Sequence, residues 1–330
     1  MMDDEELRNY FISILTKGSK SNTYKFALAR FLLEYSDKQD LGSIKNKINN
    51  NEKEIVSFSK IAEKFLKYYW HQECKYRIRQ NYDPNNHPSV VKVIREVFGE
   101  KYIPGYFSSM PREKKENAEE KIRERVFGMG YRSQVVPRFQ KLKGQPDRHP
   151  FYEWDISSGH LEIKPEALSF FHRNYTILTK AVFFEWSKFL EKINTLPRLI
   201  AKVQSEEVRR RSLTSYQSVF QDQTDCFYCN RELDERQTHV DHFIPWSYIF
   251  EDEPWNLVLA CQQCNLRKSD SLAGLNFRNN LINRNRDYQK EIPELRKSLL
   301  SLDADNNWVP VIKHHYHNCK EYGFTVRDLP

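Results

Sequence analysis

The stretch of sequence that decides the fold runs from Cys226 to Leu272 and reads CFYCNRELDERQTHVDHFIPWSYIFEDEPWNLVLACQQCNLRKSDSL. It holds two Cys-x2-Cys pairs, Cys226 with Cys229 and Cys261 with Cys264. Each pair predicts a tight knuckle that presents two thiolates, and two knuckles complete the tetrahedral sulfur shell of Zn²⁺. A redox role is the alternative, but two matched pairs favour zinc. We expect this zinc to be structural and to stabilise a short hairpin that has few core residues.

Between and just after the cysteine pairs lies a second set of polar residues that zinc binding does not require. The run THVDHF predicts a strand that ends near Pro245, NLVLA predicts the returning strand, and CNLRKSDSL predicts the start of a helix. A zinc ribbon that only bound nucleic acid would have no use for an adjacent Asp and His followed by spaced Asn residues. The set consists of His239, Asp241, His242, Asn256, Asn265 and Lys268.

This order of residues resembles that of the HNH, or ββα-metal, nucleases. The run DHFIPWSYIFEDEPWNLVLACQQCNLRKSD, residues 241–270, also resembles the HNH domain of the CRISPR RNA-guided endonucleases. The cysteine knuckles are similar to those of many restriction and homing-type HNH enzymes. The resemblance covers about residues 224–275 and does not extend to the first 200 residues.

The resemblance implies a role for each polar residue. Asp241 and the amide oxygen of Asn265 would bind a catalytic Mg²⁺ or Mn²⁺, both of which favour oxygen ligands. His242, a side chain with an ordinary pKa of about 6.5, would deprotonate the attacking water. Asn256 would hold the loop so that His242 keeps its orientation. Lys268 would either contact the phosphate or be an ordinary surface lysine.

The positions of these residues along the chain add two constraints. Asp241 and His242 are neighbours, and adjacent side chains of a strand point to opposite faces. Both can serve one site only if the strand ends or twists there. Cys264 fixes the backbone just before Asn265, so the zinc would position a ligand of the catalytic metal. Asn265 and Lys268 are three residues apart and share one helix face.

Other His and Cys residues have weaker patterns. His239 is either an extra metal contact or an exposed strand histidine, and we expect the second. The histidines and the cysteine of HHYHNC, residues 314–319, fit no common zinc spacing, so we expect no second zinc site there. Cys74 falls in a helical pattern, which indicates a buried side chain or an inert thiol.

The first 150 residues have a mainly helical pattern. Apolar residues recur at helical spacing in NTYKFALARFLLEY (22–35), IAEKFLKYYWHQ (61–72) and SVVKVIREVFG (89–99). The charge-dense segment 111–125 predicts a surface helix. Gly and Pro in the polar segment 141–150 predict a linker or a long loop.

After residue 150 the spacing of apolar residues changes from helical to alternating. FYEWDISSGHLEIK (151–164) has two alternating runs around Ser-Ser-Gly and predicts a β-hairpin. A long helical stretch follows from Pro165 to about Asn194. We therefore expect a mainly α chain with a small α+β module. Residues 1–205 would be a helical recognition or scaffold region, and residues 206–330 the zinc-stapled nuclease domain with a helical C-terminal extension.

Composition limits the class of protein. The 330 residues are 39% hydrophobic and 29% charged, as in soluble globular proteins. Glycine is scarce, at 10 residues, and no Gly-rich phosphate-binding string occurs. The acidic start MMDDEELRNYF predicts no signal peptide, and no apolar run is long enough to span a membrane. We expect a cytoplasmic protein.

The net charge of +7 favours an anionic partner, although only mildly. Clusters of basic residues can line a nucleic-acid track, but each alone is more often a solvated helix face. One cluster is interleaved with Tyr68, Tyr69 and Trp70. The basic residues are Lys60, Lys64, Lys67, Lys75, Arg77 and Arg79, then Arg209, Arg210 and Arg211, and finally Arg278, Arg284 and Arg286.

The resemblance to HNH nucleases implies an endonuclease that hydrolyses DNA, with RNA a less expected substrate. A single site cuts one strand, so a double-strand break would need a homodimer or two visits. Two alternatives remain. Either the N-terminal region senses a protein partner and gates the nuclease, or the module is catalytically silent and only binds nucleic acid. The long helical extension resembles the architecture of bacterial or phage-defence and restriction-type nucleases.

Overall fold

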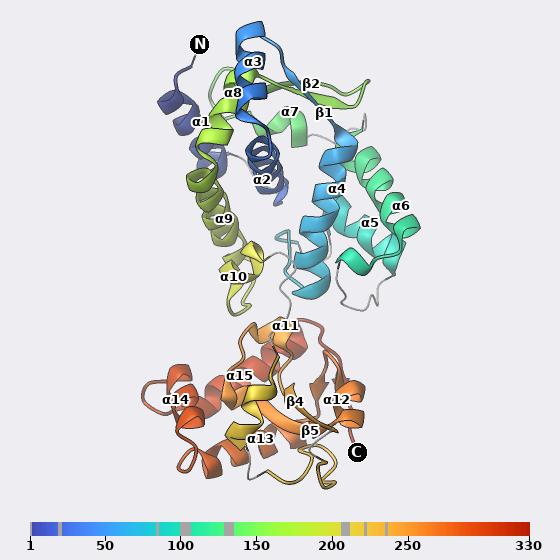
Figure 1. Cartoon of the computed structure of the whole chain (residues 1–330), viewed down its shortest axis with the longest axis vertical. Helices are drawn as coiled ribbons and strands as arrows, with labels where there is room; N and C mark the ends of the chain where they lie inside the picture. Colours follow the sequence, from blue (N-terminus) through green and yellow to red (C-terminus); the bar gives the residue numbers. More distant parts are fainter. Residues whose placement is uncertain are drawn as a thin grey trace. The chain divides into compact units, whose positions relative to one another are not determined.

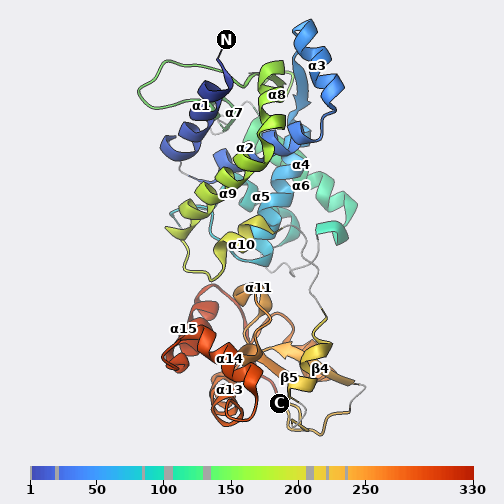
Figure 2. The same ribbon diagram turned by 60° about the vertical axis from the view of Figure 1, so that its left-hand side comes forward.

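A computed structural model gives the fold and describes residues 2–18, 22–83, 86–99, 107–128, 135–205, 212–220, 223–234 and 237–330. The chain divides into two units. The first comprises Met1–Asn194 with Leu199–Glu207, and the second Thr195–Arg198 with Val208–Pro330. The colours of Figure 1 and Figure 2 follow the chain through both units. None of the described helices has the length and apolar character that crossing a membrane requires.

Helices dominate the first unit, as the apolar spacing predicts. The helix α2 is its centre, since it packs against α4, α7, α8 and α9 and buries Phe26, Phe31 and Leu32. The helices are α1 Asp4–Lys17, α2 Tyr24–Asp37, α3 Leu41–Asn50, α4 Phe58–Tyr69, α5 Ser89–Phe98, α6 Arg112–Ile122, α7 Val135–Phe139, α8 Pro165–Arg173, α9 Tyr175–Glu191 and α10 Leu199–Gln204. The described residues of this unit also form two π-helical segments, Trp70–Lys75 and Arg123–Phe127, and one short 3-10 turn, Phe107–Ser109.

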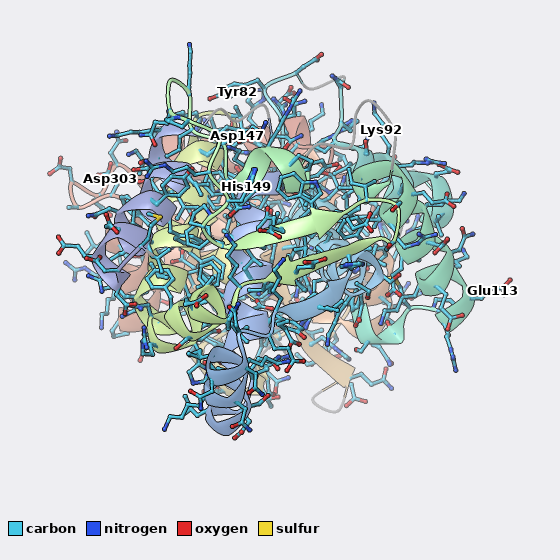
Figure 3. The ribbon with its side chains drawn as sticks, turned by 90° about the horizontal axis from the view of Figure 1, so that it is seen from above. Tyr82, Lys92, Glu113, Asp147, His149 and Asp303 are labelled. Atoms are coloured by element: carbon cyan, nitrogen blue, oxygen red, sulfur yellow. The ribbon has the colours of Figure 1, made fainter. Side chains whose placement is uncertain are left out.

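Two predicted helices, α6 and α4, are present in the structure. The charge-dense α6 buries Ala118 and Ile122 and leaves Glu113 exposed, and Glu113 projects away from the protein in Figure 3. The predicted helix at 61–72 ends as α4 at Tyr69 and passes into the π-helical segment. That segment holds Cys74, which is buried, as its pattern predicts.

The long helical stretch predicted from Pro165 to about Asn194 is present as two helices, α8 and α9, which divide at Asn174. The backbone of Asn174 leaves the helical region, at φ −103° and ψ 11°. Its side-chain Nδ2 donates to the carbonyl oxygen of Phe170 at 2.9 Å, and Arg8 donates to its Oδ1. A short amide that bonds to the preceding turn competes with the helical hydrogen bonds and permits the break.

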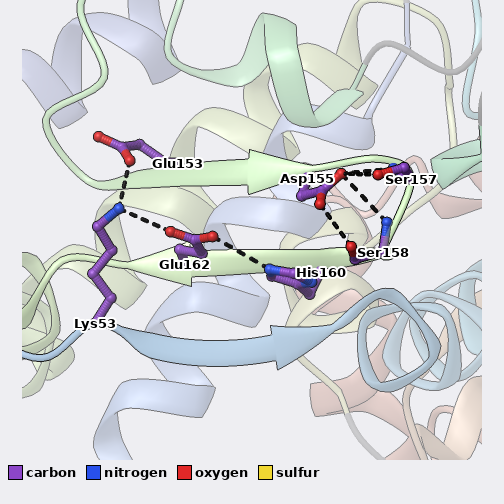
Figure 4. Close-up of polar contacts among 7 residues, drawn as sticks. All are labelled: Lys53, Glu153, Asp155, Ser157, Ser158, His160 and Glu162. Atoms are coloured by element: carbon purple, nitrogen blue, oxygen red, sulfur yellow. Dashed lines mark hydrogen bonds and ion pairs between the residues drawn. The ribbon is translucent and has the colours of Figure 1, made fainter.

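The predicted hairpin at 151–164 is present, and a third strand extends it. The strands are β1 Glu54–Ser57, β2 Tyr152–Asp155 and β3 His160–Ile163, in the antiparallel order β1-β3-β2. The Asp155 carboxylate accepts from Ser157 and Ser158 and closes the turn, as Figure 4 shows. Lys53 bridges Glu153 and Glu162 on the sheet surface at 2.5 Å and 2.8 Å (Figure 4).

The second unit is built around a two-stranded antiparallel sheet with a helix against it. The strand β4 Thr238–His242 pairs with β5 Leu257–Cys261, so that Asp241 lies opposite Val258 and His242 opposite Leu257. The helix α12 Gln262–Lys268 follows β5 directly and packs against both strands. This is the ββα arrangement that the sequence predicts, and it confirms the expected fold class.

Short turns and three longer helices surround this ββα element. Leu257 and Leu259 of β5 form a core cluster with Phe220. Val326 and Arg327 near the end of the chain pair in parallel with Leu272 and Ala273. The other elements among the described residues of this unit are the turns Thr214–Tyr216, Ser218–Phe220 and Pro254–Asn256, the helices α11 Trp246–Ile249, α13 Leu275–Tyr288, α14 Pro293–Leu302 and α15 Trp308–Glu321, and the strands β6 Leu272–Ala273 and β7 Val326–Arg327.

Candidate metal centre and active site

The four cysteines of the two knuckles converge in the second unit. Their Sγ atoms all lie within 4.8 Å of one another, and those of Cys229 and Cys261 are 3.9 Å apart. A tetrahedral zinc with Zn–S bonds of about 2.3 Å separates its sulfurs by about 3.8 Å. The cluster therefore fits Zn²⁺, as predicted. Among the described residues it is the only group of three or more His, Cys, Asp or Glu side chains with this convergence.

Backbone hydrogen bonds shape both knuckles. The first is closed where the N–H of Cys226 donates to Arg231 and the N–H of Asn230 donates to Cys226. Asn230 has a φ of 53°, a left-handed conformation that Asn tolerates in tight turns. In the second knuckle Cys261 is the N-cap of α12, and its N–H donates to the Cys226 sulfur at 3.3 Å. The β5–α12 junction therefore holds the two halves together.

The surroundings of the Cys264 thiol disfavour its ionisation. Burial raises the pKa of the Cys264 thiol, and the neighbouring thiols of Cys229 and Cys261 raise it further. A bound divalent ion reverses this cost, because its charge stabilises the thiolate form.

The Asp241 carboxylate is clamped by two donors. The Tyr228 hydroxyl donates to Oδ2 at 2.6 Å, and the Lys268 ammonium lies 3.1 Å from Oδ2 and 3.4 Å from Oδ1. Burial, and next the charge of Asp241, raise the pKa of Tyr228 far above its ordinary value, so its hydroxyl stays a donor. Sequence reasoning missed Tyr228, because a Cys-x2-Cys motif carries no information about the two residues inside it.

Of the two alternatives for Lys268, the ordinary surface lysine is wrong. Its side chain is 0% exposed, and Nζ also donates to the carbonyl oxygen of His242 at 2.6 Å. Lys268 lies at the end of α12, which packs against β4, so the helix carries its ammonium inward. The buried ion pair with Asp241 is what permits this lysine to be buried.

His242 is paired with a carboxylate from the loop that follows it. Its Nε2 lies 2.9 Å from Oδ1 of Asp252, and the histidine is buried while the carboxylate is partly exposed. With Nε2 protonated and donating to Asp252, Nδ1 is the nitrogen that can accept a proton. The acidic run EDE in the loop was visible in the sequence, but its contact with His242 was not predicted.

Asn256 ties the two ends of the same loop together. Its side-chain Oδ1 accepts from the N–H of Ile244 and its Nδ2 donates to the Ile244 carbonyl oxygen, both at 2.8 Å. The backbone of Asn256 also accepts from the N–H of Phe243 at 2.8 Å. This fully buried amide extends the β4–β5 pairing beyond His242 and fixes where the strand ends.

Asp241 and His242 have different surroundings although they are adjacent in sequence. Asp241 faces Tyr228 and Lys268, whereas His242 faces the loop. Asn265 lies next to His239, with its Nδ2 3.3 Å from the His239 Nδ1. His239 is half-buried rather than exposed as expected.

Several residues of the predicted basic clusters are not at the surface of the protein. Tyr68, Tyr69 and Trp70 are buried, so their rings cannot stack on nucleic-acid bases. Arg284 is also buried, 4.8 Å above the Phe220 ring, and is not part of a surface track. Burial lowers the pKa of Arg284 to about 9. Arg209, Arg210 and Arg211 lie outside the described residues.

The run at 314–319 lies on α15 and has structural contacts. His315 stacks on Trp255 with ring centroids 6.1 Å apart, and Cys319 is buried. His314 lies 2.9 Å from the Asn318 side chain, and His317 is exposed.

Comparison with known protein families agrees with the site. Residues 226–271 match the family model of the HNH endonuclease, and residues 6–127 match that of a domain of unknown function, DUF8808. A search of the curated proteins found no match, and a search of the solved structures found none either. The family match and the four-cysteine cluster together show that the second unit contains an HNH domain with zinc knuckles.

Proposed function

We propose that this protein is a metal-dependent endonuclease that hydrolyses phosphodiester bonds in DNA at a site built on Asp241 and His242. The HNH domain supports a nuclease acting on nucleic acid. The observation that carries the proposal is the pairing of His242 with Asp252 beside a buried Asp241 at the end of one strand. A histidine oriented by a carboxylate is the usual form of a general base.

The carboxylate of Asp241 and the amide oxygen of Asn265 are of the type that a hard divalent ion favours. Mg²⁺ or Mn²⁺ is bound in proteins by one or two carboxylate or amide oxygens, and water and substrate phosphate complete its coordination. In our proposal Asp241 and Asn265 hold this ion, and His239 lies beside Asn265 as a further donor. The ion would neutralise charge on the phosphate and on the leaving 3′ oxygen.

The other side chains have distinct tasks. His242 takes the proton of the attacking water at Nδ1, while Asp252 holds its Nε2 and stabilises the imidazolium that forms. Asn256 keeps the backbone at Ile244 in place, so the imidazole does not drift from the reacting phosphate. Lys268 balances the charge of Asp241 from inside the protein. The products would be a 5′-phosphate and a 3′-hydroxyl.

The biological setting is the second part of the proposal. A single HNH site nicks one strand, so a double-strand break requires a homodimer or two events. We propose that the N-terminal unit recognises a protein partner and that the protein acts in bacterial defence or restriction. The alternatives are a nuclease gated by that partner and a silent nucleic-acid-binding module. Both predict no cleavage by the purified protein alone.

The test is incubation of the purified, zinc-loaded protein with supercoiled plasmid, with and without Mg²⁺ or Mn²⁺. His242→Ala is the test variant, and His317→Ala, an exposed histidine of the same unit, is the matched control. We expect metal-dependent nicking by the wild type and the control and none by His242→Ala. Cleavage by His242→Ala at the wild-type rate would refute the role of His242. A single-stranded RNA substrate tested in parallel distinguishes DNA from RNA specificity.

A further inference from the structure

Tyr228 lies inside the first zinc knuckle, between Cys226 and Cys229. Its ring is buried, with the Phe277 ring 5.5 Å away in an edge-on arrangement, and its hydroxyl reaches Asp241. The knuckle thus carries a side chain that is not a zinc ligand directly to the carboxylate of the active site.

The contact is strong enough to orient the carboxylate. The 2.6 Å distance is that of a charge-assisted O–H···O bond, which is about twice as strong as a neutral one. Because Tyr228 and Lys268 both engage Oδ2, rotation of the Asp241 carboxylate about its Cβ–Cγ bond would break two contacts. Its remaining lone pairs therefore keep one direction in the absence of any metal.

Both donors are attached to segments that the zinc joins. Tyr228 belongs to the first knuckle, and the Phe227 N–H next to it donates to the Leu259 carbonyl of β5 at 3.0 Å. Lys268 ends α12, whose N-cap is Cys261 of the second knuckle. The four cysteines join the first knuckle to α12, and α12 packs against β4, the strand that carries Asp241.

We propose that Tyr228 is a positioning residue through which the zinc-bound knuckle holds the Asp241 carboxylate ready for the catalytic divalent ion. This inference rests on the proposed function, since it assigns Asp241 to that ion. It also gives the zinc a task beyond folding. The Tyr228 hydroxyl couples zinc binding at the cysteines to divalent-ion binding at Asp241, beside the contact from Lys268.

The experiment compares Tyr228→Phe with Tyr316→Phe in the full-length, zinc-loaded protein. Each change removes one hydroxyl from a buried ring, but the Tyr316 hydroxyl donates to the Ala273 carbonyl and does not touch Asp241. Binding of Mn²⁺ to the substrate-free protein is measured by electron paramagnetic resonance of the free ion, and zinc content by elemental analysis. The Mn²⁺ dependence of plasmid cleavage is measured in parallel.

We expect Tyr228→Phe to bind Mn²⁺ about 10- to 100-fold more weakly, the usual effect of removing a partner of a metal ligand. Its zinc content should equal that of the wild type, and excess Mn²⁺ should restore cleavage. Tyr316→Phe should bind Mn²⁺ like the wild type.

Three outcomes would overturn the proposal. Unchanged Mn²⁺ affinity of Tyr228→Phe, with a wild type that cleaves, removes the positioning role and leaves the proposed function intact. Loss of zinc from Tyr228→Phe assigns the hydroxyl to the knuckle instead of Asp241. A wild type that neither binds Mn²⁺ nor cleaves refutes the proposed function together with this inference.

Discussion

Replacing Lys268 with methionine would test whether the ion pair with Asp241 is as isolated from water as the structure indicates. Methionine has nearly the volume of lysine, so the change removes the charge without opening a cavity. The lysine side chain is fully buried and that of Asp241 is 9% exposed, with 3.1 Å between Nζ and Oδ2. The variant therefore leaves a buried carboxylate whose remaining donor is Tyr228.

The expected cost is about 3–5 kcal/mol of unfolding free energy, the range for breaking a buried pair by removing one partner. An exposed pair would instead contribute about 1 kcal/mol or less. The double variant Asp241→Asn with Lys268→Met removes both charges, so it should be more stable than Lys268→Met alone.

The assay is urea unfolding of the zinc-loaded protein, in which the release of zinc to a chromogenic chelator is the signal. This signal reports the second unit alone, because the four cysteines all lie in it. A loss below about 1 kcal/mol for Lys268→Met would mean that water reaches the pair, and it would refute the reasoning.

Three further predictions concern the same unit. Asp252→Asn should slow cleavage, because the amide no longer stabilises the charged His242. The loss should be at most the roughly 10²–10⁴-fold that a general base contributes. The control is Glu251→Gln, which alters the same loop at a residue paired with Arg198. Asn256→Ala should cost about 1–3 kcal/mol for each buried backbone group left unpaired. Asn256→Asp should cost more, because it buries an unpaired carboxylate against the Ile244 carbonyl oxygen. Chelator-detected unfolding measures both. Cys226→Ser should lower zinc content and unfold the second unit, while far-UV circular dichroism retains the helical signal of the first.

Each of these predictions has an opposing result. Equal cleavage rates for Asp252→Asn and the wild type would remove the carboxylate from the orientation of His242. An Asn256→Ala variant as stable as the wild type would mean that water replaces the lost hydrogen bonds. A Cys226→Ser variant that keeps a full complement of zinc would contradict the four-cysteine site.

The parts of this structure that sequence reasoning could predict are those set by short-range spacing. The Cys-x2-Cys pairs, the ββα order and the amphipathic helices α2, α4 and α5 depend on residues close together in the chain. The strand β1 was missed because its partner β3 lies about one hundred residues away, and a run of four residues has no distinctive period. The break at Asn174 depends on one hydrogen bond from its side chain to the carbonyl oxygen of Phe170.

The polar contacts of the site were the hardest to foresee. Lys268 follows the pattern of an exposed helix end, and only the packing of α12 against β4 shows that it is buried. Asp252 was one of three acidic residues in a loop, and the sequence does not indicate which of them faces His242. Both contacts arise from tertiary packing, which overrides the local preference for exposure.

Replacing zinc by cobalt at the four-cysteine site would give this protein an optical signal. Co²⁺ accepts the same tetrahedral sulfur ligands as Zn²⁺ but absorbs visible light, and its absorption bands respond to small distortions of the ligand shell. Tyr228 is one residue from Cys229 and two from Cys226, and it is hydrogen-bonded to Asp241. Events at the carboxylate should therefore shift the colour of the cobalt-substituted protein, which would make occupancy of the active site visible without substrate.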